Sequence, residues 1–248
     1  MISFPNESQE YRSAREKLLE KEIELRRTME DVAIARRGLP PGGLVPQNYV
    51  FDGLDADGQP VRIKLSELFA TGQDTLLIYN MMFPRHPQET RDVATSGETA
   101  KLAVQDQPCP SCTALLDHLD RAVGHMTAAG FNFAVVAKTS LDNLVTLGRE
   151  RDWANMRLLS SAGNSFKRDY HAEAEDGAQL PMLSVFHRDA EGIRHFWSSE
   201  LGYAEPEPGQ DPRALCTVDT PWNLMDFTPE GRSQAWREQL QYADACCS

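Results

Sequence analysis

The strongest limit on the fold of this chain is a pair of cysteines two residues apart, in Pro108-Cys109-Pro110-Ser111-Cys112. An unbroken apolar run at 75–83 precedes the pair, and such a run is typical of a central strand covered on both faces. A helical pattern follows at 113–126, and Gly130 ends it. The order of strand, Cys-x-x-Cys turn and helix predicts a dithiol held where a loop enters a helix.

The rest of the chain alternates short strands with helices, which indicates an α/β fold with a mixed central sheet. Strands are predicted at 48–51, 61–65, 75–83, 131–137, 156–159, 180–186 and 193–197, with the first two and the last two paired as hairpins. Helices are predicted at 7–37, 113–126 and 140–151, and a last one begins at Pro229 with Trp236 and Leu240 turned inward. Residues 85–107 are polar and irregular, as in a long loop or an insertion.

This pattern divides the chain into a helical arm at 1–40, one domain at 41–235 that contains the insertion, and the end of the last helix with a tail at 236–248. A chain of 248 residues can bury one good core. The arm carries an apolar stripe with the spacing of one helix face, made of Tyr11, Ala14, Leu18, Leu25, Met29 and Val32. The stripe predicts that the arm docks on the main domain or on a second copy, as a homodimer.

The net charge of −12 argues against nucleic acid and against an anionic membrane as partners. No apolar run approaches the length of a membrane helix, and the first residues carry no secretory signal pattern. The five cysteines are an odd number, so at least one is unpaired. A cytoplasmic location is therefore expected, where cysteines are more often catalytic, metal-binding or inert than structural.

The position of Cys109 at a helix start favours its thiolate, because free N–H groups and the positive helix end face it. Pro110 suits the first helical turn, where its missing N–H has no partner to lose. Cys112 lies one turn later, placed to attack a mixed disulfide formed on Cys109. Cys109 is thus the predicted nucleophile and Cys112 the resolving thiol. The predicted substrate is a disulfide-containing protein or a small thiol, with an upstream reductant and no cofactor.

A Cys-x-x-Cys pair alone also fits a metal site or inert thiols. A structural zinc ion would need two more ligands with paired spacing, and neither His118 nor His125 stands close enough to Cys112. Neither cysteine has the Pro-x-x-x-Thr/Ser-x-x-Cys pattern of a peroxiredoxin. A thiol peroxidase and a binding or assembly module with vestigial cysteines remain as alternatives.

The remaining cysteines have less defined roles. Cys216 has no partner by spacing and is expected to be a packed or free thiol. Cys246 and Cys247 are adjacent near the C-terminus, where they could pass electrons to the dithiol or lie exposed without a function.

The order of strand, dithiol and helix resembles that of thioredoxin-like proteins. The thioredoxin fold places a cis-proline opposite its dithiol, and Pro181 opens a strand at the corresponding point of this chain. The resemblance therefore predicts a cis Leu180–Pro181 bond and a role for Pro181 in the site, with an ordinary trans proline as the alternative.

Four stretches carry a wider resemblance, namely 36–40, 49–53 with 65–69, 79–83 leading to the dithiol, and 222–232. They are similar to a bacterial family of predicted dithiol–disulfide oxidoreductases with a thioredoxin-like fold, domain-of-unknown-function family 899. The resemblance covers residues 10–235 and implies that Cys109 and Cys112 are redox-active. Members of that family place the dithiol closer to the preceding strand. Residues 85–107 therefore look inserted, as a lid over the dithiol or as a partner surface.

Overall fold

The computed structural model describes residues 2–205, 207, 218–232 and 236–242. The chain divides into two compact units, residues 1–42 and residues 43–248. Cys216, Cys246 and Cys247 lie outside the described residues. No described helix combines the length and the apolar composition that crossing a bilayer requires.

The first unit contains the predicted long helix, α1 (Gln9–Arg37). Ser8 caps it, since its hydroxyl accepts a hydrogen bond from the Tyr11 N–H at 3.1 Å. The helix contains neither glycine nor proline, and it ends where Gly38 donates to the Ile34 carbonyl. The helix prediction is confirmed, and its apolar stripe lies along one face of α1.

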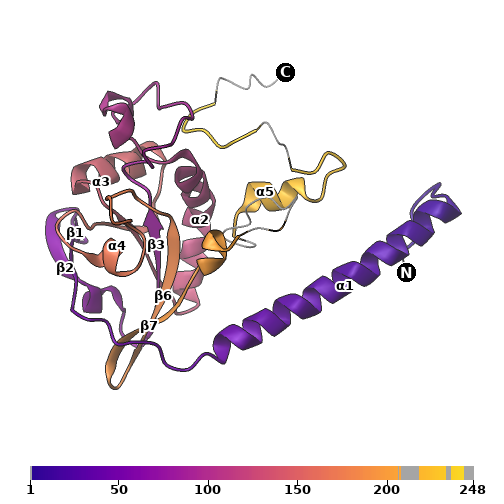
Figure 1. The fold of residues 1–248 in the computed structure, drawn as a ribbon, viewed down its shortest axis with the longest axis horizontal. Helices are drawn as coiled ribbons and strands as arrows, with labels where there is room; N and C mark the ends of the chain where they lie inside the picture. Colours follow the sequence, from indigo (N-terminus) through magenta and orange to yellow (C-terminus); the bar gives the residue numbers. More distant parts are fainter. Residues whose placement is uncertain (1, 206, 208–217, 233–235, 243–248) are drawn as a thin grey trace. The chain divides into compact units, whose positions relative to one another are not determined.

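The second unit is a seven-stranded mixed sheet in the order β2-β1-β5-β4-β3-β6-β7 (Figure 1). The strands are β1 (Val50–Leu54), β2 (Pro60–Lys64), β3 (Thr75–Met81), β4 (Asn132–Ala137), β5 (Arg157–Ser160), β6 (Met182–Asp189) and β7 (Gly192–Ser198). The α-helices are α2 (Pro110–Ala128), α3 (Leu141–Glu150), α4 (Phe166–Asp169) and α5 (Thr220–Met225), and the 3₁₀-helices are η1 (Leu65–Leu68), η2 (Thr99–Lys101), η3 (Val104–Asp106) and η4 (Glu200–Tyr203).

The strand pairing gives the predicted thioredoxin-like fold. β3 and β4 are parallel and are joined through α2, and β5 extends the parallel part. β6 runs antiparallel to β3 on its other side and forms a hairpin with β7. A βαβ unit followed by an antiparallel hairpin on the same sheet is the core of that fold, and both predicted hairpins are confirmed.

Alternation along the central strands builds a core on each face of the sheet. Tyr79 and Met81 pack with Leu116 of α2 and Leu144 of α3. On the other face, Leu76 and Ile78 pack with Leu65 of η1 and Phe166 of α4. The two long helices therefore cover one face, short helices cover the other, and the dithiol belongs to the first.

The predicted last helix is wrong for the residues that are described. Neither 229–232 nor 236–242 is helical, and α5 lies earlier, at Thr220–Met225. Gly231 has a φ of 64°, and its N–H donates to the Thr228 carbonyl, so this stretch closes a turn. Leu240 is buried as predicted, but from a non-helical segment.

The predicted cis bond at Leu180–Pro181 is also wrong, because that bond is trans. The cis bond among the described residues is Phe83–Pro84. The trans backbone satisfies its polar groups on both sides of Pro181: the Leu180 N–H donates to the Ala172 carbonyl at 2.9 Å, and the Pro181 carbonyl accepts from the Tyr203 hydroxyl.

Candidate active site

The dithiol stands where the loop after β3 enters α2. Cys109 is the residue that precedes the helix, and Pro110 is the first helical residue, as predicted. The Cys109 N–H donates to the Met82 carbonyl at 3.0 Å, and both the N–H and the hydroxyl of Thr113 donate to the Cys109 carbonyl. These bonds fix the turn between the end of β3 and the first turn of α2.

Both cysteines are buried thiols, with exposed fractions of 0% for Cys109 and 1% for Cys112. The Cys109 thiol donates a hydrogen bond to the Cys112 sulfur. The Tyr79 hydroxyl, from the middle of β3, donates to the same sulfur at 3.3 Å. Cys112 therefore accepts two hydrogen bonds inside the core.

This arrangement shifts the pKa values of the two thiols in opposite directions. Burial by itself would raise the pKa of Cys112, but the hydrogen bonds from Cys109 and Tyr79 outweigh it and lower the pKa to about 7. The hydrogen bond to Cys112, together with burial, raises the pKa of Cys109 well above its ordinary value. The hydrogen bonds of both neighbours therefore favour a thiolate on Cys112. The thiolate on Cys109 that the helix start favours stays a prediction.

Residues 85–107 are here called the cover. They contact Cys109 through the side chain of Arg91. The Arg91 guanidinium stands 3.9 Å from the Cys109 sulfur and donates to the Ser111 hydroxyl at 2.7 Å. Two carboxylates hold it in place, Glu89 at 2.5 Å and Glu238 at 3.2 Å. The Ser111 hydroxyl also donates to Glu238, at 2.9 Å. Arg91 thus ties the cover to the dithiol turn and to the segment 236–242.

The bend that brings Arg91 inward is built around Arg85, whose side chain is fully buried. Its guanidinium donates to the Arg91 carbonyl at 2.6 Å and lies 3.7 Å from Glu89. Its backbone N–H donates to the Gln107 carbonyl at 2.8 Å, which joins the two ends of the cover.

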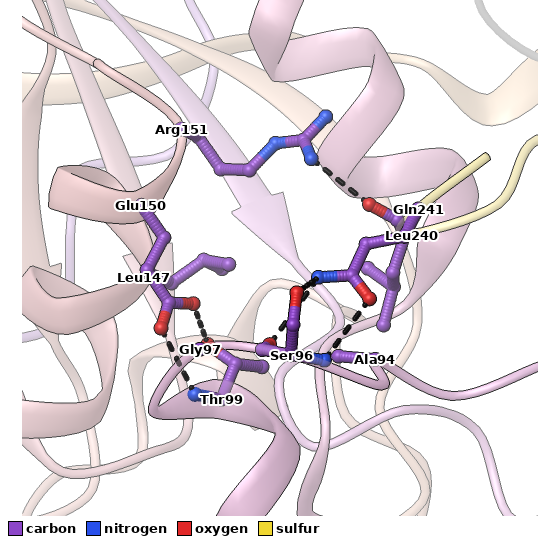
Figure 2. A pocket seen from close by; sticks show the side chains of 9 residues that line it. All are labelled: Ala94, Ser96, Gly97, Thr99, Leu147, Glu150, Arg151, Leu240 and Gln241. Atoms are coloured by element: carbon purple, nitrogen blue, oxygen red, sulfur yellow. Dashed lines mark hydrogen bonds between the residues drawn. The ribbon is translucent and has the colours of Figure 1, made fainter. Parts of the chain in front are cut away.

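Farther from the sulfurs, the cover is attached on two sides of a small cavity of about 230 Å³ (Figure 2). The Glu150 carboxylate, at the end of α3, accepts from the Thr99 N–H at 3.1 Å and from the Thr99 hydroxyl. Opposite it, Gln241 accepts from the Thr95 N–H at 2.7 Å and donates to the Ser96 hydroxyl at 2.6 Å. The cover is therefore fastened to α3 and to the segment 236–242.

The charge of Cys112 acts on two further polar side chains, Tyr203 of η4 and Lys167 of α4. Tyr203 donates to the carbonyl of Pro181, and burial, with the charge of Cys112, raises the pKa of Tyr203 to about 12. Lys167 is fully buried, and its ammonium donates to the Met81 carbonyl at 2.6 Å. Pro181 directly precedes Met182, the partner of Asn80 near the end of β3, and its role in the site stays a prediction.

Sequence reasoning found the two cysteines and missed the polar side chains around them. Tyr79 had a signal, because it stands inside the apolar strand that leads to the dithiol. Arg91 had a weaker signal, because it lies in the segment 85–107 that the sequence marks as an insertion. Lys167 and Glu238 had none. His118 and His125 are exposed on α2, and the described residues contain no group of three or more His, Cys, Asp or Glu suited to a metal ion.

Comparison with solved structures finds distant similarities. An uncharacterized conserved protein from Geobacillus kaustophilus is 16% identical, with a TM-score of 0.41 over 71% of this chain and 77% of that one. A hypothetical protein from Sinorhizobium meliloti 1021 is 15% identical, with a TM-score of 0.40 over 72% and 80%. Reduced Prx3 from Vibrio vulnificus in complex with H₂O₂ is 15% identical, with a TM-score of 0.43 over 70% and 91%. These values add nothing to the topology already described.

No curated protein matches the chain. A family model matches it over residues 1–245, which include the arm, the whole sheet, the cover and the dithiol. The chain therefore belongs to the family of bacterial proteins of unknown function DUF899.

Proposed function

We propose that the protein is a thiol–disulfide oxidoreductase that works through Cys109 and Cys112. The observation that carries this proposal is the buried pair at the start of α2, in which the Cys112 sulfur accepts hydrogen bonds from Cys109 and Tyr79 that lower its pKa. A thiolate is the reactive form in disulfide exchange, and a pKa near ambient pH gives a useful thiolate fraction without losing nucleophilicity. Two inert thiols in a core would not require a hydrogen bond that lowers the pKa of one of them.

The exchange begins on Cys109, the sulfur that faces Arg91 and the cover. Its proton passes along the hydrogen bond to the Cys112 thiolate while the Cys109 sulfur attacks a disulfide R–S–S–R. A bond forms between Cys109 and one substrate sulfur, and the other sulfur leaves as a thiolate. Cys112 then passes its proton to the thiolate that has left and attacks the Cys109 sulfur, which releases the second substrate sulfur as a thiolate. Two electrons have moved from the cysteine pair to the substrate.

The closed cover is part of this proposal, because a substrate sulfur cannot reach Cys109 while its exposed fraction is 0%. Opening has to separate Arg91 from Ser111 and Glu238, the contacts that lie directly over the pair. The substrate is proposed to be a disulfide in a protein or a small molecule, and an upstream reductant restores the dithiol. A cytoplasmic setting, in which such reductants act, stays a prediction.

The experiment is a redox titration of the full chain in glutathione buffers of graded ratio. After acid quenching and alkylation, peptide mass spectrometry locates each disulfide. The expected result is one Cys109–Cys112 disulfide whose fraction follows a two-electron curve, and which the C109S variant cannot form. A pair that stays reduced in every buffer would reject the proposal and favour a binding module with vestigial cysteines.

A further inference from the structure

Lys167 is a fully buried lysine that the exchange chemistry above does not use. It lies in α4, with an exposed fraction of 0%. Its ammonium nitrogen is 2.6 Å from the Met81 carbonyl, at the end of β3. Met81 lies on the same sheet face as Tyr79 and belongs to the same core cluster as both cysteines. The next carbonyl along the strand, that of Met82, accepts from the Cys109 N–H.

Burying an ammonium costs several kcal/mol, so a buried lysine is expected to have a compensating negative charge. The carboxylate of Glu173 favours the ammonium of Lys167. Glu173 is, however, already paired with Lys138 at 2.9 Å and with Arg168 at 2.9 Å. Lys138 adds a positive charge that disfavours the ammonium of Lys167. The peptide unit between Met81 and Met82 lies between Lys167 and the dithiol: its carbonyl accepts from the Lys167 ammonium, and its N–H interacts with the Cys112 sulfur. The Cys112 thiolate is thus the other negative charge close to Lys167.

We infer that Lys167 is a positioning residue of the dithiol, whose buried ammonium is the counter-charge of the Cys112 thiolate in the reduced protein. This inference rests on the proposed function. The thiolate is also stabilised by Cys109 and Tyr79, which donate hydrogen bonds to its sulfur. Its charge in turn helps to raise the pKa of Tyr203. Lys167 supplies the positive charge from the α4 side of the sheet.

The arrangement links oxidation of the dithiol to a proton on Lys167. The reduced pair holds one proton on Cys109 and one negative charge on Cys112, with an ammonium on Lys167. Oxidation by R–S–S–R forms the Cys109–Cys112 bond and removes that negative charge. The proton of Cys109 goes to one product thiolate and the proton of Lys167 to the other, which yields two molecules of R–SH. Burial then favours the neutral amine, and its pKa, already lowered to about 7, falls further.

The test is a titration of thiolate absorbance at 240 nm in the reduced full chain, for wild type, Lys167→Met and Lys64→Met. Methionine fills similar volume without charge. The wild-type midpoint is expected near pH 7, and Lys167→Met is expected to raise it by about one unit. Lys64→Met is the control, because Lys64 is exposed on β2, the edge strand that lies four places from β3 in the sheet. A midpoint in Lys167→Met equal to that of wild type would overturn the inference.

A second measurement needs no substitution. Lysine NMR signals of the wild-type chain, assigned to Lys167 by their loss in Lys167→Met or in Lys167→Gln, are titrated in the reduced and the oxidised protein. The expected pKa of Lys167 is lower after oxidation, and equal values in the two states would contradict the counter-charge role. A shifted thiolate midpoint in a protein that exchanges no disulfide would sustain the inference and reject the function.

Discussion

At the residue scale, the chemistry of the pair depends on which groups approach each sulfur. Cys112 lies inside the core and accepts hydrogen bonds from Cys109 and Tyr79. Cys109 lies at the helix start under Arg91. Inside a protein each such bond is stronger than in water, because little solvent screens it. The two cysteines therefore have different surroundings, although they are one turn apart, and the hydrogen bonds favour the thiolate form of Cys112.

Replacing Tyr79 with phenylalanine removes one hydrogen bond to the Cys112 sulfur and leaves the ring in the core. Because a hydrogen bond to a charged group stabilises it by about 1.5–3 kcal/mol, the thiolate midpoint is expected to rise by about one to two units. Absorbance at 240 nm measures it. Tyr170→Phe is the control, since Tyr170 packs on the opposite sheet face. A midpoint that moves equally in both variants would count against the role of Tyr79.

Lys167 also predicts how stability changes with pH. Its pKa is about 7 in the folded chain because burial disfavours the charge, whereas the unfolded chain keeps the proton up to pH ~10.4. Between these values the unfolded state binds more protons, so the free energy of unfolding rises with pH by up to about 1.4 kcal/mol per unit. Urea unfolding of the reduced protein at pH 7 and pH 9 measures the rise. The rise is expected to be smaller in Lys167→Met. A rise of the same size in that variant would mean that other groups cause it.

Local rules predicted part of the site. Cys109 before the helix and Pro110 in its first turn follow from the preferences of helix starts. Arg91 and Glu238 are 147 residues apart in sequence, so no local pattern joins them. The helix start predicts a thiolate on Cys109, but no local pattern predicts that the buried hydroxyl of Tyr79 donates to Cys112. Helical preference at Pro229 was likewise overridden, by a turn at Gly231.

At the scale of elements, the cover is proposed to control access to the dithiol. It contains only the short η2 and η3, and its attachment depends on side chains of α3 and the segment 236–242 (Figure 2). Segments held by a few hydrogen bonds open more easily than core strands. The sequence indicated an insertion here from its polar composition, but it could not show which residues fasten it.

Gln241→Ala tests the cover without touching either sulfur. The substitution removes hydrogen bonds to Thr95 and Ser96 and leaves Arg91 in place. Alkylation of Cys109 by iodoacetamide under native conditions is expected to become about tenfold faster, since the lost bonds stabilise the closed state by about 1–2 kcal/mol. Peptide mapping identifies the alkylated cysteine.

Gln239→Ala is the matched control, because it removes a glutamine from the same segment without removing those bonds. Equal alkylation rates in wild type and Gln241→Ala would mean that Cys109 is reached by another route than opening at Thr95 and Ser96.

At the scale of the whole molecule, the sheet and the arm are separate units. The sheet topology could be predicted, because each central strand is a continuous apolar run and each helix has a clear face. The role of the arm could not, since a stripe on one helix face fits more than one partner. The arm is proposed to pair with the arm of a second copy.

Leu18→Asp with Leu25→Asp places charges on the stripe of α1. If the arm pairs with a second copy, these charges are expected to convert a dimer into a monomer, which sedimentation equilibrium measures. Glu16→Asp with Arg27→Asp, on the opposite helix face, is the control. A wild-type chain that is monomeric at high micromolar concentration would contradict the proposed pairing.

The most direct test of the exchange chemistry uses the Cys112→Ser variant, which lacks the resolving thiol. Incubated with oxidised glutathione and then digested, it is predicted to carry one stable glutathione adduct, on Cys109, while wild type closes the Cys109–Cys112 disulfide and retains none. An adduct that forms elsewhere, or none on Cys109 after the cover has been loosened by Gln241→Ala, would contradict a mechanism that begins on Cys109.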